Sequence, residues 1–260
     1  MNHMDKNRPL ILISNDDGYN YNGIQSLIKV ARTIGDVFVV APAVHQSGMA
    51  SAITFVHPVR TIPVASEDGY TAYLTTGTPA DCVKLALSQL MADRQPDLVL
   101  AGINHGYNHG LNTLYSGTMA CAFEALMHGV PAVAFSYGDY STQADTSVCE
   151  PIVDHVVKRV MQGGLPQGVC LNVNIPALQE PFKGMKVTSG DMGRWVNEWE
   201  HRTDPNGRDY YWLTGDFEMG DKGEGVTDYY WLKRGYVTVT PCHIDQTDYA
   251  SMARISDLLL

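Results

Sequence analysis

Short apolar runs alternate with amphipathic segments along the first 175 residues. The apolar runs, which are typical of buried strands, lie at 9–14, 37–41, 97–103, 132–137 and 169–175. Between them, apolar residues at helical spacing predict helices at 23–34, 80–92, 117–128 and about 151–161. The strand runs are continuously apolar rather than alternating, which favours a parallel sheet covered on both faces. The repeated strand–helix order therefore predicts a doubly wound α/β domain.

Two parts of the chain depart from this order. Residues 53–64 and 70–75 predict a β-ribbon with a turn at Glu67, Asp68 and Gly69. After about residue 185 the long periodicity ends, and residues 190–232, rich in Trp, Tyr, Gly and Asp, predict loops and a hairpin. Residues 236–240 alternate as a strand, and residues 248–260 predict a terminal helix. We therefore expect a catalytic domain at 1–185 and a C-terminal extension at 186–260.

Composition and charge restrict the class of protein. The 260 residues include 45% hydrophobic residues, enough for a substantial core, and carry a formal net charge of −10. Such an acidic surface argues against nucleic-acid polymers and anionic membranes as partners. The five scattered cysteines include no Cys-x-x-Cys, which disfavours a zinc site or a disulfide framework. No apolar leader or run of about 18 apolar residues occurs, so we expect a cytoplasmic protein.

Polar residues follow three of the predicted strands. Asp16 and Asp17 follow the first strand, Ser47 lies in the loop after the second, and Asn104 follows the strand at 97–103. Ligands of open parallel sheets bind at the carboxyl ends of the strands, so these loops should share one edge. Two adjacent carboxylates with a hydroxyl and an amide oxygen suit one Mg²⁺ or Mn²⁺ ion per subunit. The alternative is that Asp16-Asp17-Gly18 is an ordinary solvated turn.

A second polar group begins the helix predicted at 117–128. Ser116, Gly117 and Thr118 stand at its start, where free N–H groups and the helix dipole favour an anion. Ser116 also has the residue type of an ordinary N-cap, and both functions can hold together. The candidate catalytic residues are therefore Asp16, Asp17, Asn104, Ser116 and Thr118.

Other features carry weaker signals. Glycines recur at positions 102, 106 and 110, but neither a Walker A loop nor a dinucleotide fingerprint after the first strand is present. His105 and His109 are candidates for phosphate or base contacts, and His243 with Asp245 for protonation of the leaving group. His201 lies in the extension among aromatic residues suited to base stacking or to an oligomer interface. These are Trp195, Trp199, Tyr210, Tyr211, Trp212, Tyr229, Tyr230 and Trp231.

Several motifs together resemble those of the SurE survival-protein family, and the resemblance covers nearly the whole chain. They are SNDDG (14–18), APAVHQSGMAS (41–51), GTPADCVKLAL (77–87), AGIN (101–104), LYSGTMACAFEA (114–125), LNVNIP (171–176) and GYVTVTPCHIDQTD (235–248). The resemblance implies a Rossmann-like domain with a C-terminal hairpin extension exchanged between subunits, in a homodimer or homotetramer. It implies a metal-dependent 5′/3′-nucleotidase acting on nucleoside monophosphates.

The resemblance also assigns residues. It places the metal on Asp16, Asp17, Ser47 and Asn104, and the phosphate near Ser116, Gly117 and Thr118. One departure occurs in TSGDMGRW (188–195), where Arg194 is followed by Trp195 instead of the second basic residue that family members often carry. The alternative hypotheses for the function are a dinucleotide-dependent redox enzyme and a non-catalytic nucleotide-binding protein.

Overall fold

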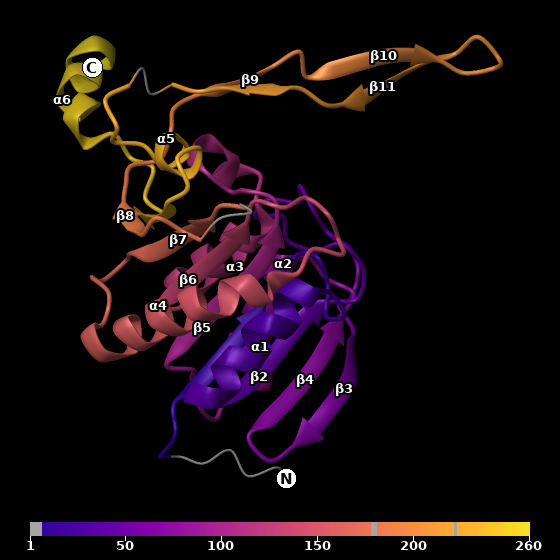
Figure 1. Ribbon diagram of the computed structural model, residues 1–260, viewed down its shortest axis with the longest axis vertical. Helices are drawn as coiled ribbons and strands as arrows, with labels where there is room; N and C mark the ends of the chain where they lie inside the picture. The colour runs from indigo at the N-terminus through magenta and orange to yellow at the C-terminus, as the bar shows by residue number, and fades with distance from the viewer. Residues whose placement is uncertain (1–6, 178–180, 221–222) are drawn as a thin grey trace.

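The computed structural model describes residues 7–177, 181–220 and 223–260 (Figure 1). Its centre is a sheet in which the described residues supply nine strands, in the order β3-β4-β2-β1-β5-β6-β7-β13-β8. Strands β4, β2, β1, β5, β6 and β7 are parallel, whereas β3 and β13 run antiparallel to their neighbours β4 and β7. The strands span Leu10–Ser14 (β1), Asp36–Pro42 (β2), Thr61–Glu67 (β3), Tyr70–Thr75 (β4), Leu98–His105 (β5), Ala132–Tyr137 (β6), Cys170–Ile175 (β7), Met185–Val187 (β8) and Val237–Cys242 (β13).

Helices cover both faces of this sheet. They are α1 (Asn22–Ile34), α2 (Pro79–Leu85, continued by the π-helical turn Ala86–Leu90), α3 (Gly117–Met127) and α4 (Glu150–Gly163). In β1, Ile11 and Ile13 pack with α1 and α4, while Leu10 and Leu12 pack with α2 and α3. Because successive side chains of a strand point to opposite faces, one continuously apolar strand supplies both cores. The predicted α/β fold is confirmed.

The predicted β-ribbon is only partly confirmed. Its first strand begins at Thr61 rather than at residue 53. The Thr54 N–H donates to both carboxylate oxygens of Asp81, at 3.1 Å each, so this segment is held beside the start of α2. The ribbon also extends the central sheet, because β4 pairs with β2 in parallel.

The residues after β8 form an extended arm, which we define as residues 194–218. Its strands pair as β9 (Arg194–Val196) with β12 (Asp216–Glu218), and as β10 (Trp199–Thr203) with β11 (Asp209–Leu213). Figure 1 shows the β10–β11 hairpin reaching away from the sheet. The expected hairpin is therefore present, and all ten residues of β10 and β11 are exposed.

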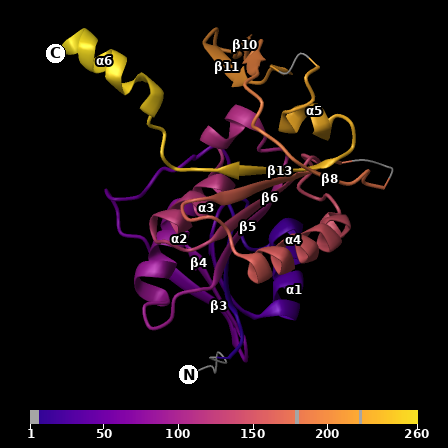
Figure 2. The ribbon, with the colours of Figure 1, turned by 90° about the vertical axis from the view of Figure 1, so that its left-hand side faces the viewer.

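The chain after the arm returns to the body and then leaves it again. The short helix α5 (Asp228–Leu232) was not predicted, because a single turn shows no periodicity. Strand β13 then enters the central sheet, so the division of the chain at residue 185 stays a prediction. The 3₁₀ turn Tyr249–Ser251 and helix α6 (Met252–Leu259) follow and stand clear of the body in Figure 2. None of the described helices has the length and apolar character needed to span a bilayer.

Candidate active site

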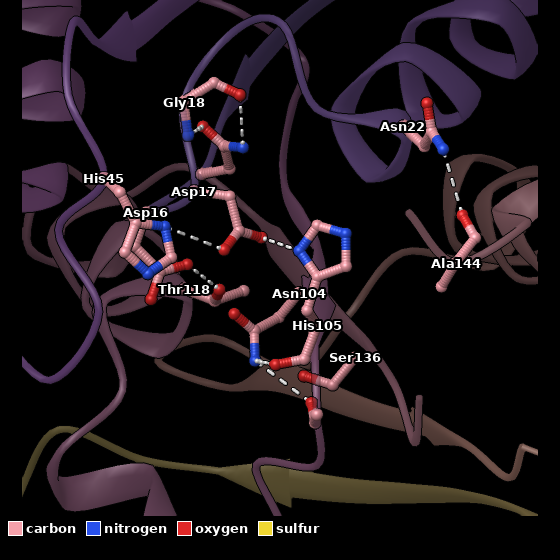
Figure 3. A network of polar contacts seen from close by, with 12 residues as sticks. Asp16, Asp17, Gly18, Asn22, His45, Asn104, His105, Thr118, Ser136 and Ala144 are labelled. Carbon is pink, nitrogen blue, oxygen red and sulfur yellow. Dashed lines mark hydrogen bonds and ion pairs between the residues drawn. The ribbon is translucent and has the colours of Figure 1, made fainter. Parts of the chain in front are cut away.

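The two adjacent carboxylates after β1 are buried and have different partners. Asp16 is 3% exposed and Asp17 is 1% exposed. The Thr118 hydroxyl donates to Asp16 Oδ1 at 2.5 Å. Asp17 lies between two histidines, with His105 Nδ1 2.9 Å from its Oδ2 and His45 Nδ1 3.4 Å from its Oδ1 (Figure 3). The two residues are adjacent in the chain, but their side chains lie in two separate environments.

A tight turn directs these carboxylates into the protein. The Asn15 side chain donates to the Gly18 carbonyl at 3.0 Å and accepts from the Gly18 N–H at 3.1 Å. Gly18 has φ +112°, a conformation that residues with side chains rarely adopt. The segment is therefore a turn, but the burial of Asp16 and Asp17 excludes the ordinary solvated turn.

Asn104 is presented by an irregularity near the end of β5. The pairing of β5 with β6 shifts between Ala101 and Asn104, which inserts one extra residue on β5. Such bulges re-aim a side chain beside a site. The Asn104 Nδ2 donates to the carbonyls of His105 at 3.1 Å and Gly106 at 3.0 Å. This leaves the amide oxygen turned toward the two carboxylates in Figure 3.

Ser47 lies on an exposed loop that is tied to the same edge of the sheet. The Gln46 N–H donates to the Asp16 carbonyl at 2.8 Å, and the Ala50 N–H donates to the Tyr115 carbonyl at 3.2 Å. The loop therefore connects the end of β1 with the segment that precedes α3.

The start of α3 fits closely against Asp16. A Cβ on Gly117 would lie 2.7 Å from Asp16 Cβ and 2.9 Å from Pro79 Cγ, so only glycine fits without displacement. Ser116 caps the helix by accepting from the Met119 N–H at 3.0 Å. The first N–H groups of a helix have no intrahelical acceptor, so those of Gly117 and Thr118 are available to an anion.

A cavity of about 740 Å³ joins several of these residues. Asp16, Ser47, Asn104 and Ser116 all line it. Asp17 and Thr118, which are both buried, are not among the described residues that line it. The cavity falls within the usual size range of small-molecule sites.

The electrostatics of the buried carboxylates suit a cation. Burial raises the pKa of Asp16 to about 6, and repulsion from Asp17 adds to this effect against the hydrogen bond from Thr118. The neighbouring Asp17 carboxylate raises the pKa of His105 above its usual value, although burial of the ring opposes this shift. A positive ion would relieve the repulsion between the two carboxylates.

The donor chemistry narrows the kind of ion. Within residues 7–177, 181–220 and 223–260, no three His, Cys, Asp or Glu side chains form a group able to hold a metal. Two carboxylates complemented by the Ser47 hydroxyl and the Asn104 amide oxygen instead form an all-oxygen set. Such hard donors fit Mg²⁺ or Mn²⁺ better than zinc.

Comparisons with known proteins agree with this geometry. Residues 11–197 match the family model described as Survival protein SurE. The chain belongs to the SurE family. A protein of Christiangramia forsetii named 5′-nucleotidase SurE is 46% identical over 247 residues, which cover 94% of each chain. A second 5′-nucleotidase SurE, from Bacteroides thetaiotaomicron, is 42% identical over 246 residues, covering 95% of this chain and 94% of the relative.

A solved SurE structure has the same fold. The crystal structure of the SurE protein from Aquifex aeolicus is similar with a TM-score of 0.83 and 37% identity. The similarity covers 96% of this chain and 99% of that one, and therefore includes most of the C-terminal extension. The family resemblance inferred from the motifs is confirmed.

Three other candidate histidines, His109, His201 and His243, do not line the cavity that contains Asp16 and Asn104. His109 is buried in an aromatic cluster, with its ring stacked on Tyr229 at 4.2 Å and edge-on to Phe217 at 4.5 Å. Burial lowers its pKa to about 4. His201 pairs with Asp209 on the arm at 2.8 Å. His243 is exposed, and Asp245 accepts from the Tyr249 hydroxyl.

Two buried aspartates that connect the arm to the site were not anticipated from the sequence. Asp228 accepts from the N–H groups of Gly110 at 2.8 Å and Asp191 at 2.9 Å. Asp191 accepts from the N–H groups of Gly193 and Gly220, both at 2.7 Å. The sequence offered little signal, because aspartate is common in loops and these backbone partners lie far apart along the chain.

Proposed function

We propose that this SurE protein is a divalent-metal-dependent phosphomonoesterase that hydrolyses nucleoside 5′- and 3′-monophosphates to nucleoside and phosphate. The observation that carries the proposal is the convergence of Asp16, Ser47, Asn104 and the start of α3 on one cavity. Relatives named 5′-nucleotidase SurE, at 41–46% identity over nearly the full chain, support the nucleotide as substrate.

The proposed metal ligands are Asp16, Asp17, Ser47 and Asn104, holding one Mg²⁺ or Mn²⁺ ion. Their neighbours pre-organise them, because Thr118 fixes Asp16, His105 and His45 flank Asp17, and two carbonyls fix the Asn104 amide. When bound, such a cation supplies positive charge that polarises a phosphate ester and lowers the pKa of water. Metal ligands whose orientation is fixed by hydrogen bonds from neighbouring groups bind the metal more tightly and more selectively.

The start of α3 is the proposed phosphate cradle. The N–H groups of Gly117 and Thr118 and the Ser116 hydroxyl proton are available to phosphoryl oxygens, because Ser116 Oγ acts only as an acceptor toward Met119. Preorganised donors of this kind stabilise charge that develops during phosphoryl transfer. The Thr118 hydroxyl itself is bonded to Asp16, so its contribution is to hold that carboxylate.

Asp16 is the proposed residue that orients the attacking water or takes up its proton. The water oxygen forms a bond to phosphorus as the water gives up a proton to Asp16, the ester P–O bond breaks, and the leaving alkoxide takes a proton from solvent. A direct attack by the Asp16 carboxylate is the alternative. Rapid acid quenching during turnover, followed by peptide mapping, distinguishes them, and phosphate recovered on Asp16 would overturn the water route.

Phosphate release from AMP, GMP and 3′-AMP, with Mg²⁺ or Mn²⁺ and with EDTA, tests the function. We expect EDTA to abolish release and added metal to restore it. Asp16→Asn and Asp17→Asn should each lose most of the activity and weaken Mn²⁺ binding measured by calorimetry, while remaining folded. The matched control is Asp154→Asn on the exposed side of α4. Unchanged turnover or unchanged Mn²⁺ affinity in both site variants would refute the assignment.

The assembly proposed for this enzyme is a homodimer or homotetramer in which the extension at 186–260 is exchanged between subunits. The exposed apolar side chains of the arm and of α6 support it, since α6 has no buried residue. The substrates are nucleoside monophosphates rather than nucleic-acid polymers, in keeping with the net charge of −10. The cytoplasmic location expected from the sequence stays a prediction.

A further inference from the structure

A cluster of buried polar side chains lies at the carboxyl ends of β6 and β7. It consists of Ser136 on β6, Asn172 and Asn174 on β7, and Asn108 in the segment that follows β5. The first three are fully buried, and Asn108 is 7% exposed and lines the active-site cavity. Burying an amide costs free energy unless it is hydrogen-bonded, so the partners of these groups indicate what the cluster does.

The two asparagines of β7 hold the backbone of Asn108. They are two positions apart on the strand and therefore project from the same face. Asn174 Oδ1 accepts from the Asn108 N–H at 2.8 Å, and Asn172 Nδ2 donates to the Asn108 carbonyl at 2.7 Å. Asn174 Nδ2 also donates to Asn172 Oδ1 at 3.1 Å, which fixes both amides. Asn108 lies outside any strand, yet both of its backbone polar groups are bound as they would be in a sheet.

The cluster extends across the sheet toward Asn104. The Asn108 Nδ2 donates to Ser136 Oγ at 2.9 Å. Ser136 is the register partner of Asn104 on β5 and of Asn174 on β7 (Figure 3). The buried amides of β7 and the proposed metal ligand on β5 are therefore separated by one residue of the intervening strand.

The segment held by β7 also holds the Asn104 side chain. Gly106, two residues before Asn108, accepts at its carbonyl from Asn104 Nδ2 at 3.0 Å. The Gly106 N–H donates to the carbonyls of Tyr137 at 2.7 Å and Asp139 at 3.1 Å. Because the oxygen and nitrogen of an amide are joined through one planar group, binding the nitrogen to this carbonyl also directs the oxygen. The direction of the Asn104 oxygen thus depends on where the segment from Gly106 to Asn108 lies.

We propose that Asn172 and Asn174 are positioning residues of the active site, which hold the Asn104 amide oxygen in place for the metal through Asn108 and Gly106. The inference rests on the proposed function and concerns the same site. Neither asparagine of β7 is among the described residues that line the cavity, so each acts through other residues. Groups that orient a metal ligand contribute a factor of about 10–100 in metal affinity.

Substitutions of Asn174 and Asn172 test each hydrogen bond to Asn108. Asn174→Leu removes the acceptor for the Asn108 N–H, whereas Asn174→Asp keeps an acceptor there and gives up only the bond to Asn172. We expect the Kd for Mn²⁺, measured by calorimetry, to rise about tenfold or more in Asn174→Leu and less than about threefold in Asn174→Asp. Asn172→Asp sets a carboxylate against the Asn108 carbonyl, so its Kd should rise about as much as that of Asn174→Leu.

The activity should follow the metal affinity. At limiting Mn²⁺, hydrolysis of AMP by Asn174→Leu should fall about tenfold or more. Saturating Mn²⁺ should restore most of kcat, with KM for AMP close to that of the wild type. Such recovery distinguishes a weakened metal site from a damaged substrate site.

Hydrogen exchange in the metal-free protein gives a readout that needs neither metal nor activity. The amide of Asn108, followed by mass spectrometry of the peptide that contains it, should exchange faster in Asn174→Leu than in the wild type or in Asn174→Asp, because it has lost its acceptor. The control is Thr240→Val, which removes a hydroxyl pair with Thr188, 3.1 Å apart, on the neighbouring strand β13. It should leave both the exchange of Asn108 and the affinity for Mn²⁺ unchanged.

Two outcomes overturn the proposal. Asn174→Leu with the Mn²⁺ affinity of the wild type would show that the β7 asparagines do not position Asn104. An equal loss of affinity in Thr240→Val would show that the cluster only stabilises the sheet. If Asn174→Leu does not fold, Asn172→Leu, which removes the donor to the Asn108 carbonyl, replaces it with the same expected results. A wild type that neither binds Mn²⁺ nor hydrolyses AMP would instead refute the proposed function itself.

Discussion

At the scale of single residues, Asp16 and Asp17 are neighbours in the chain with separate surroundings. Asp16 faces Thr118 and the cavity, whereas Asp17 faces His45 and His105. This separation lets one carboxylate meet the substrate side while the other remains fully enclosed. It depends on how closely α3 approaches β1, which is set by the glycine at position 117.

Gly117→Ala should therefore damage the site. The added Cβ would lie 2.7 Å from Asp16 Cβ and 2.9 Å from Pro79 Cγ, so Asp16 or α3 must shift. We expect Mn²⁺ affinity and phosphatase activity to fall more than tenfold, and the free energy of unfolding to fall by about 1–3 kcal/mol. Calorimetry, phosphate release and urea denaturation measure the three effects.

The matched control for this substitution is Gly163→Ala near the end of α4, where an added Cβ would meet nothing within 4 Å. Alanine there should leave activity unchanged and stability the same or slightly higher, because alanine favours a helix. A Gly117→Ala protein with the metal affinity of the wild type would show that the close approach of α3 to Asp16 is unimportant.

His109 should make stability depend on pH. Burial lowers its pKa in the folded protein from 6.5 to about 4, although Asp191 opposes this shift. Between these values the unfolded chain binds a proton that the folded protein does not, so stability falls as the pH decreases from about 7 to 4. The loss from this residue should reach about 3 kcal/mol, in proportion to the shift.

Urea denaturation at several pH values measures this effect. His109→Phe should flatten the dependence between pH 7 and pH 4, whereas His155→Gln, at an exposed position on α4, should not. Equal slopes in the wild type and His109→Phe would contradict the assignment of this effect to His109.

At the scale of elements, the site depends on how α3, β5 and the arm are joined. The β5 bulge directs Asn104, and the segment between β5 and α3 also carries His109 and Asn112, which contact the arm. Asp228, at the start of α5, bonds to both Gly110 and Asp191 and so fastens this segment to the base of the arm. The arm residues that line the cavity, such as Trp195 and Glu198, are thus positioned by hydrogen bonds outside the cavity itself.

Asp228→Ala should loosen that connection. It leaves the N–H groups of Gly110, Asp191 and Tyr229 without this acceptor. Burial raises the pKa of Asp228, so removing the charge offsets part of the loss. We expect a net loss of roughly 2–4 kcal/mol in the free energy of unfolding.

The same substitution should also lower phosphatase activity, because it loosens the arm residues that line the cavity beside Asp16. The control Asp154→Ala removes an exposed ion pair with Lys158 and should cost less than about 1 kcal/mol. Equal thermal stability of the two variants would show that the hydrogen bonds of Asp228 contribute little to the stability of the fold.

In the molecule as a whole, the β10–β11 hairpin is exposed along both of its strands, although four of their residues are tryptophan or tyrosine. Trp199 and Tyr211 lie on one face of the β10–β11 hairpin, and Tyr210 and Trp212 lie on the other. All four are exposed, and a two-stranded hairpin alone is marginally stable in water. A second copy of the chain is the expected cover for these faces.

The double variant Tyr210→Ser with Trp212→Ser should weaken this association. Light scattering coupled to size-exclusion chromatography should give a multiple of 28.6 kDa for the wild type and a smaller average mass for the variant on dilution. Asn206→Ser at the hairpin turn is the control and should keep the mass of the wild type. A wild type that elutes with the mass of one chain at every concentration would contradict the exchange of the extension.

The alternation of strands and helices follows from the amino-acid sequence alone, because the period of apolar residues records which side of each element is buried. The sequence also selected the strand-end residues Asp16, Ser47 and Asn104, since the ends of parallel strands must share an edge. It failed where no period exists, as in the single-turn helix α5 and in the start of β3, which tertiary contacts move to Thr61.

Which atoms face one another depends on the folded arrangement of the whole chain. This arrangement brought the Thr118 hydroxyl to Asp16, the His105 ring to Asp17, and Trp195 to the cavity opposite Asp16. These partners are separated by many tens of residues, and apolar periodicity carries no information about which distant loops meet. That pairing results from the crossing of helices over the sheet and the return of the arm, which depend on packing of the whole chain.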